Sequence, residues 1–135
     1  METCMLNDDI KLICIAARSF PDGVLAVHQK LHADFALGNG RRYFGISYPA
    51  GKGTIVYKAG TEELATSEAE KTGYETFILK KGNYIYKDVL NFRENIAVIG
   101  KTFSELLIHT NIDPNGCCVE EYLNETDVRC MVRLQ

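Results

Sequence analysis

Glu120 and Tyr122 stand two positions apart in the segment C-V-E-E-Y-L, whose composition is typical of a β-strand. Alternate side chains of a strand share one face, so Cys118, Glu120 and Tyr122 are expected to point the same way. A carboxylate among aromatic rings is poorly solvated, which raises its expected pKa. Such a group can attract a cationic ligand, helped by cation–π contacts of roughly 0.5–2 kcal/mol per tyrosine, or it can act as a general acid or base. Both uses need the same residues, and a surface glutamate on an open strand face is the plain alternative.

The other face of this strand carries apolar residues. Val119 and Leu123 suit a core covered by a helix. We therefore predict that Glu120 looks into a cleft and that Glu121 lies at an edge or reaches solvent.

Tyrosine is the second signal, because the chain has seven Tyr and six Phe but no Trp. Tyr84 and Tyr86 share a face of one expected strand, and Phe44, Ile46 and Tyr48 share a face of another. Tyrosine gives rigid contact area with a polar tip, so these five residues are candidates for a pocket wall. Half-buried sheet positions, where tyrosine is common, are the alternative.

Other site chemistries find little support. His28 and His32 are spaced i, i+4, but no acidic third ligand or H-E-x-x-H pattern accompanies them, so we expect no metal. Gly51-Lys52-Gly53 lacks the length and the following helix of a P-loop, and no serine nucleophile elbow is present. We expect no cofactor. The odd count of five cysteines, without a secretion signal, favours thiols that act as small apolar residues.

Composition restricts the partners. The net charge of −3 and the dispersed Lys and Arg residues argue against direct nucleic-acid binding. No apolar run approaches the roughly 20 residues that cross a bilayer, and the first nine residues lack a basic n-region. We therefore expect a cytosolic protein that has no membrane partner.

The first half of the chain reads as strand, helix, strand, strand. Ser19 and Asp22 are expected to cap the helix, and Gly38-Asn39-Gly40 to end it. A polar, Glu-rich connector that can hold one helical turn spans 61–72. The expected strands are 11–18, 43–48 and 54–58, and the apolar helix stripe is Phe20, Val24, Val27, Leu31 and Phe35.

The second half repeats this order. Strands over 75–80 and 83–90 flank Lys81-Gly82 as a hairpin. A turn at Asp113-Pro114-Asn115-Gly116 follows the second helix. The expected last strands are 117–123 and 128–134, and the second helix stripe is Ile96, Ile99, Phe103, Leu106 and Thr110.

A shift of 76 residues superimposes the halves, placing Leu31 on Leu107 and Asn39-Gly40 on Asn115-Gly116. The simplest account is an internal duplication of a βαββ module. We predict one α+β domain over 1–135, with pseudo-repeat halves at about 10–60 and 74–135. Each half contributes an antiparallel sheet and one main helix around a central ligand cleft.

Several segments resemble one family. Val119-Glu120-Glu121-Tyr122-Leu123-Asn124, after D-P-N-G-C-C, is similar to the closing E-x-Y-L strand of the gyrase-inhibitor-like small-molecule-binding domain. That domain is also the effector-binding part of bacterial multidrug-sensing transcription activators. Tyr43-Phe44-Gly45-Ile46-Ser47-Tyr48 resembles its Y-x-G-x-S/D strand, and T-F-I-L-K-K-G-N-Y-I-Y, the helix end F-S-E-L-L and the final C-M-V-R-L resemble its other elements.

The resemblance implies two βαββ modules with a pocket for hydrophobic, often cationic, compounds. Some relatives are hydrolases of strained-ring natural products that use the acidic residue matched here by Glu120. Members often place a Trp in the pocket, and this chain has none, which leaves the shape of a ligand open.

Three functions follow as hypotheses. The leading one is a stand-alone domain that binds a small hydrophobic or cationic molecule through Glu120, Tyr122, Cys118 and the aromatic wall. The second is a hydrolase in which Glu120 is the general acid or base and Tyr122 or Tyr48 positions a water or leaving group. The third is a protein-interaction module with an acidic surface at Glu62, Glu63, Glu68 and Glu70. About ten residues precede the first expected strand, too few for a helix-turn-helix, so we expect no direct DNA regulation unless a separate partner supplies the DNA reader. A binder remains the leading hypothesis over an enzyme.

Overall fold

The computed structural model describes residues 2–35, 40–65 and 67–135, and its contacts divide the chain into two units. Unit 2 is the continuous stretch Asp9–Leu79. Unit 1 combines the N-terminal residues up to Asp8 with Lys80–Gln135. Gly38 and Asn39, part of the expected helix stop, lie outside the described residues.

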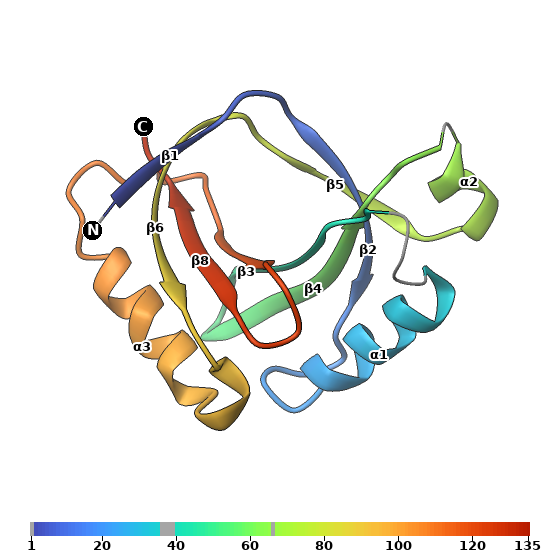
Figure 1. Ribbon diagram of the computed structural model, residues 1–135, viewed down its shortest axis with the longest axis horizontal. Coiled ribbons are helices and arrows are strands. Elements are labelled where there is room, and N and C mark those ends of the chain that lie inside the picture. The colour runs from blue at the N-terminus through green and yellow to red at the C-terminus, as the bar shows by residue number, and fades with distance from the viewer. Residues whose placement is uncertain (1, 36–39, 66) are drawn as a thin grey trace. The chain divides into compact units, whose positions relative to one another are not determined.

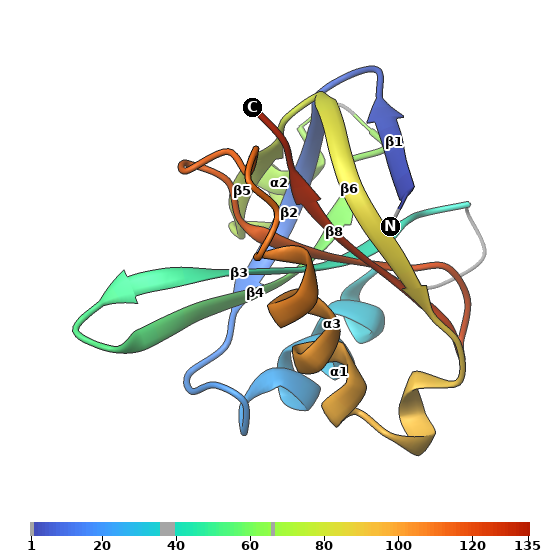
Figure 2. The same ribbon diagram turned by 90° about the vertical axis from the view of Figure 1, so that its left-hand side faces the viewer.

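Unit 2 is an antiparallel sheet with strand order β3, β4, β2, β5 and a helix packed on it. Figure 2 shows β3 and β4 running side by side as a long hairpin; both strands are longer than predicted. The polar connector contains the short helix α2, in agreement with the prediction. The elements are β2 (Ile10–Ala16), α1 (Val24–Asp34), β3 (Tyr43–Gly51), β4 (Thr54–Glu62), α2 (Glu68–Thr72) and β5 (Glu75–Leu79).

Helix α1 covers one face of this sheet, alongside β2 and β4 (Figure 1). Val27, Leu31 and Phe35 of the expected stripe are buried. The predicted start of the helix is wrong: α1 begins after Gly23, and no side chain caps it. The main-chain carbonyl of Ser19 accepts the Gly23 N–H at 3.1 Å, so backbone atoms close a turn where the capping box was expected.

Unit 1 contains four antiparallel strands in the order β1, β6, β8, β7. Helix α3 runs along β6 and β8 (Figure 1), and its residues Phe103 and Leu106 are buried against Val128 and Val132 of β8. The elements are β1 (Glu2–Leu6), β6 (Gly82–Val89), the 3-10 helix η1 (Phe92–Glu94), α3 (Ala97–Leu106), β7 (Cys118–Tyr122) and β8 (Val128–Arg133).

Two strand predictions are corrected by the observed pairing. The strand β1 was not expected, and it pairs with β6 from Glu2 opposite Tyr86 to Leu6 opposite Gly82. The expected hairpin around Lys81-Gly82 does not form, because β5 pairs with β2 while β6 lies between β1 and β8. Both sides of β6 are therefore occupied by other strands.

The observed fold is of the α+β class, as predicted. Along the chain, unit 2 has the order β2, α1, β3, β4, and unit 1 has the order β6, α3, β7, β8. One further strand pairs with the first strand of each series: β5 with β2, and β1 with β6. In the part of the chain that the structure describes, no helix is long and apolar enough to cross a membrane.

Candidate ligand-binding site

The pairing of β7 with β8 determines which residues surround Glu120. In this register Cys118 lies opposite Val132, Glu120 opposite Cys130, and Tyr122 opposite Val128. Side chains that lie opposite each other in an antiparallel pair share a face. Glu120 therefore emerges from a surface made of thiols, valines and one tyrosine.

This surface is on the side of the sheet that α3 covers. Cys118 and Tyr122 pack against the buried cluster that includes Phe103 and Leu106 of α3. The ring of Tyr122 lies 5.7 Å from the ring of Phe92, centroid to centroid.

The prediction that Val119 faces the helix-covered core is thus wrong. Val119 is fully buried, but on the opposite face of the sheet, where its partner is Met131. Leu123 follows the end of β7 and is 41% exposed. Ile85 and Val89 of β6 belong to the cluster that packs against α3. Because β6 pairs with β8 and β8 with β7, their register places Cys118, Glu120 and Tyr122 on this same face.

The carboxylate of Glu120 is half-buried, and Tyr122 Oη donates a hydrogen bond of 2.6 Å to its Oε1. Helix α3 packs on β6 and β8, and Glu120 is carried by the neighbouring strand β7. A charged group in such a partly desolvated place interacts more strongly with an opposite charge than one in bulk water.

Two thiols of unit 1 are held in the neutral form, and one of them, Cys130, lies opposite Glu120. Burial, reinforced by the charge of Glu120, raises the pKa of Cys130 to about 12. Burial also raises the pKa of Cys117 to about 12. Because the thiolate is the reactive form of cysteine, neither residue has the character of a nucleophile near neutral pH.

Tyr84 and Tyr86 do not lie with Glu120. They alternate with Ile85, which belongs to the α3-facing cluster, so they occupy the opposite face of the sheet. Tyr84 is 2% exposed and donates to the Lys80 carbonyl at 2.6 Å, and burial raises its pKa to about 12. Tyr86 donates to Glu2 at 2.6 Å, and the Arg129 guanidinium lies 4.3 Å from its ring centroid.

Phe44, Ile46 and Tyr48 belong to β3 in unit 2, on the face away from α1. That assignment follows from Tyr43, the neighbour of Phe44, whose ring lies 4.1 Å from the ring of His32 on α1. Phe44 and Ile46 are fully buried, which fits core packing. Tyr48 is half-buried, and the Lys58 ammonium lies 5.8 Å from its ring centroid.

A polar contact between His28 and Tyr57 in unit 2 was not predicted from the sequence. His28 Nε2 and Tyr57 Oη lie 2.7 Å apart, and the ring of Phe20 stacks on Tyr57 at 5.8 Å. The spacing of His28 and His32 on an apolar helix face was the available signal, but each histidine contacts a different tyrosine. Within the described ranges, no three His, Cys, Asp or Glu side chains come together as metal ligands.

The acidic stretch considered for protein interaction is largely neutralised by neighbouring cations. Glu62 pairs with Arg42, Glu63 with Lys11, and Glu68 with Arg41, at 3.3, 3.3 and 2.7 Å. The surface therefore presents much less negative charge than its sequence indicates.

Comparison with known proteins gives a fold but no family. No family model matches the sequence, and no curated protein is significantly similar to it. The fold is similar to that of SAV2435 bound to tetraphenylphosphonium, with a TM-score of 0.70 and 13% identity over 99% of this chain and 93% of the other.

Two further solved structures share the fold. An integron cassette protein from the mobile metagenome of Vibrio cholerae has a TM-score of 0.68 and 10% identity, covering 99% of this chain and 95% of the other. A hydrolase from Listeria innocua has a TM-score of 0.54 and 8% identity, covering 99% of this chain and 90% of the other. At these identities the likeness is one of fold alone.

Proposed function

We propose that this protein binds a small hydrophobic cation, with Glu120 as the counter-charge and Tyr122 as part of the aromatic contact surface. The observation that carries the proposal is the half-buried Glu120 carboxylate, which accepts a hydrogen bond from Tyr122 and has apolar neighbours on β7 and β8. The predicted βαββ duplication, single domain and ligand cleft are parts of this proposal.

The half-buried Glu120 carboxylate is partly desolvated, which strengthens its attraction for an opposite charge. A bulky cation with a delocalised charge loses little hydration when it approaches such a group. Apolar and aromatic surface beside the anion then contacts the rest of the ligand. The structural neighbour bound to tetraphenylphosphonium supports this choice of ligand class.

The decisive experiment is a titration with tetraphenylphosphonium, followed by calorimetry and by thermal unfolding. Binding should stabilise the folded state by about 2.7 kcal/mol at a hundredfold excess over Kd. Glu120→Gln, which removes the charge and keeps the shape, should weaken binding at least about tenfold, as expected for the loss of a charge-assisted contact.

Glu121→Gln is the matched control. Glu121 is the next residue of β7 and is also half-buried, but it points to the opposite face of the sheet. In the strand pairing it lies opposite Arg129 of β8. The variant should bind as the wild type does. Equal losses in both variants, or no binding by the wild-type protein, would overturn the proposal.

A hydrolase is the second candidate, favoured by the solved hydrolase that shares this fold. Here Glu120 would accept a proton from a water molecule whose oxygen attacks a strained ring, and the opened ring oxygen would be protonated by solvent. The raised pKa values of Cys117 and Cys130 oppose a thiol nucleophile. Incubation with styrene oxide distinguishes the two functions. A hydrolase consumes it and its Glu120→Gln variant does not, whereas a binder leaves it unchanged.

A protein-interaction module is the weakest candidate. Three carboxylates of its expected acidic surface have cationic partners. The substitution Glu70→Gln, which neutralises an exposed carboxylate of this surface, should then change the affinity for a protein partner very little.

A further inference from the structure

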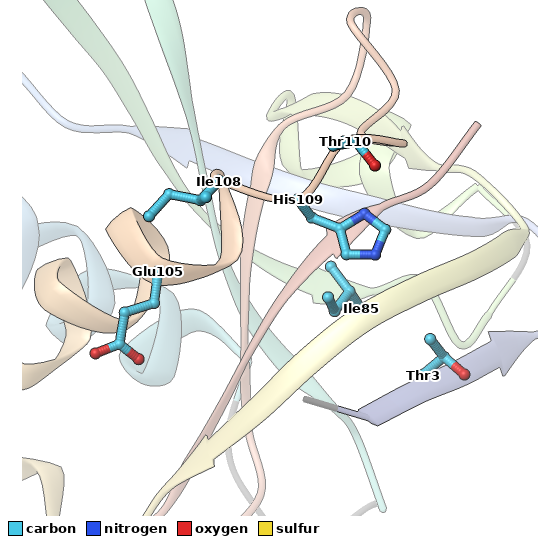
Figure 3. Close-up of a pocket in the computed structure, with 6 residues that line it drawn as sticks. All are labelled: Thr3, Ile85, Glu105, Ile108, His109 and Thr110. Atoms are coloured by element: carbon cyan, nitrogen blue, oxygen red, sulfur yellow. The ribbon is translucent and has the colours of Figure 1, made fainter.

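A hollow of about 430 Å³, largely open to solvent and called the cavity below, lies on unit 1 at the C-terminal end of α3. Its volume is within the range of small-molecule sites, which is about 300–1,000 Å³. Figure 3 shows Ile85 in the middle, Glu105 and Ile108 on the α3 side, and His109 and Thr3 on the other. The lining residues are Thr3, Ile85, Glu105, Ile108, His109 and Thr110.

The apolar part of the cavity pairs a buried side chain with an exposed one. Ile85, on β6, is 3% exposed and belongs to the α3 core cluster. Ile108, just after α3, is 80% exposed. A large apolar side chain left in water at the rim of a cavity with an apolar floor is typical of a contact surface for an apolar group.

The electrostatics of the α3 side favour a cation. Glu105 lies in the last turn of α3, and that turn has no basic residue. The C-terminus of a helix carries partial negative charge, which the Glu105 carboxylate reinforces. Its counter-ion is Lys87 at 3.4 Å, a contact between exposed side chains (53% for Lys87 and 36% for Glu105) that contributes little. An ammonium group would be well compensated here.

The opposite side offers hydrogen-bond donors. His109 Nδ1 accepts the Asn111 backbone N–H at 3.1 Å, so the proton of the neutral ring is assigned to Nε2. Figure 3 shows the second ring nitrogen on the side of Ile85 and Thr3. The Thr3 and Thr110 hydroxyls add donors in the same cavity.

We propose that this cavity binds a short-chain primary amine that also carries a hydroxyl or carboxylate acceptor, of the amino-alcohol or amino-acid class. The ammonium lies at Glu105, the alkyl chain lies between Ile85 and Ile108, and the acceptor receives the His109 Nε2–H bond.

This site is independent of the one at Glu120. In the strand order β1, β6, β8, β7, Thr3 belongs to the first strand and Glu120 to the last, and α3 packs on the two strands between them. A ligand in the cavity therefore contacts none of the residues proposed to bind the hydrophobic cation.

The test is an NMR titration of the ¹⁵N-labelled full chain with 5-aminopentan-1-ol and, separately, 5-aminopentanoate, which carry the amine and the acceptor at opposite ends of the alkyl chain. Saturable shifts should concentrate at the amides of Ile108, His109 and Thr110 and at the His109 ring. Pentylamine, which lacks the acceptor, should bind about tenfold more weakly, and pentanoate, which lacks the amine, should not bind at these residues.

Glu105→Gln should weaken binding about tenfold, and Glu125→Gln, an equal charge change in the exposed turn between β7 and β8, should not. The dispersion of each variant's spectrum reports whether it is folded. Saturation by 5-aminopentan-1-ol or by 5-aminopentanoate supports the proposal and selects the acceptor class. Scattered or non-saturable shifts with both, or equal effects of the two substitutions, would overturn it.

A parallel titration with tetraphenylphosphonium separates the two proposals. Glu120→Gln should keep its response to the amine, and Glu105→Gln should keep its response to the phosphonium. Loss of both responses in either single variant, with the spectrum still dispersed, would contradict independent sites.

Discussion

Glu120 lies directly opposite Cys130 in the register of β7 and β8, so a carboxylate and a thiol share one face of the sheet. Burial is the main cause of the raised Cys130 pKa, and the negative charge of Glu120 adds to it because it opposes formation of a thiolate. The acidic residue thus adds to the burial that keeps Cys130 protonated.

Alkaline pH should destabilise the protein through its buried thiols. The pKa of Cys14 and of Cys130 is about 12 in the folded chain and near 9.0 for an ordinary thiol. The folded state therefore binds more protons than the unfolded state between these values, and the free energy of unfolding should fall as pH rises above about 9. Urea unfolding at pH 8, 9 and 10 measures this dependence.

The control for this prediction is the double variant Cys14→Ala and Cys130→Ala. It should be less stable than the wild type at pH 8, because two buried side chains become smaller, but its stability should fall less steeply with pH. An identical pH dependence in the two proteins would contradict the assignment to these thiols.

Tyr122→Phe should separate stability from ligand binding. The variant loses the hydrogen bond to Glu120, which should lower the free energy of unfolding by about 1–2 kcal/mol. It keeps the ring and the carboxylate, so affinity for tetraphenylphosphonium should change by less than about threefold. Tyr86→Phe, which removes an exposed hydrogen bond to Glu2 on the other face, is the control and should change both quantities less. If Tyr122→Phe abolishes binding, the hydroxyl itself contacts the ligand.

Glu68→Gln should destabilise unit 2 by about 2 kcal/mol, because Arg41 loses a charged, two-bond partner. The Arg41 side chain is 7% exposed, so little water can replace that partner. The hydrogen bond from Arg41 lowers the pKa of Glu68, so this contribution should be present above about pH 4.5 and lost as the pH falls below it. Denaturant unfolding at pH 7 and pH 3 measures both effects. Glu70→Gln, an exposed change in the same short helix, should have little effect at either pH.

Two glycines should respond in opposite directions to alanine. Gly100 lies in α3 with open space where a Cβ would be, so Gly100→Ala should stabilise the protein by about 0.5–1 kcal/mol. Gly82 has a φ of +136°, which disfavours any side chain, and a Cβ there would meet Arg133 at 3.0 Å. Gly82→Ala should therefore destabilise by about 1–3 kcal/mol. Thermal unfolding of the two variants checks the sign, and a stabilising Gly82→Ala would show that the strand start relaxes.

Local periodicity explains the part of the fold that could be predicted. The apolar spacing of Val27, Leu31 and Phe35 predicted which face of the first helix segment is buried. The spacing of Phe103 and Leu106 predicted the buried face of α3 in the same way. The turn at Asp113–Gly116 was also predictable, and the Gly116 N–H donates to the Asp113 carbonyl at 3.0 Å. In each case the signal and the structure lie within a few residues of one another.

The errors concern interactions between distant segments. The run E-T-C-M-L has no marked alternation, and its partner β6 is far along the chain, so β1 could not be found locally. A period of two shows that Cys118, Glu120 and Tyr122 share a face, but only packing shows that α3 covers that face. The cavity at the end of α3 likewise brings Thr3 beside His109, a proximity that no short pattern contains.

The pairing of β1 with β6 has a consequence for synthesis on the ribosome. Partner residues of these strands lie 76 to 84 positions apart, from Leu6 with Gly82 to Glu2 with Tyr86. Unit 2 is continuous from Asp9 to Leu79 and can be completed as soon as Leu79 has left the exit tunnel. The strand β1 must wait, unpaired, until β6 has been translated, and closing so long a loop costs conformational entropy. Unit 1 is therefore completed after unit 2 and stays accessible to chaperones and proteases for longer.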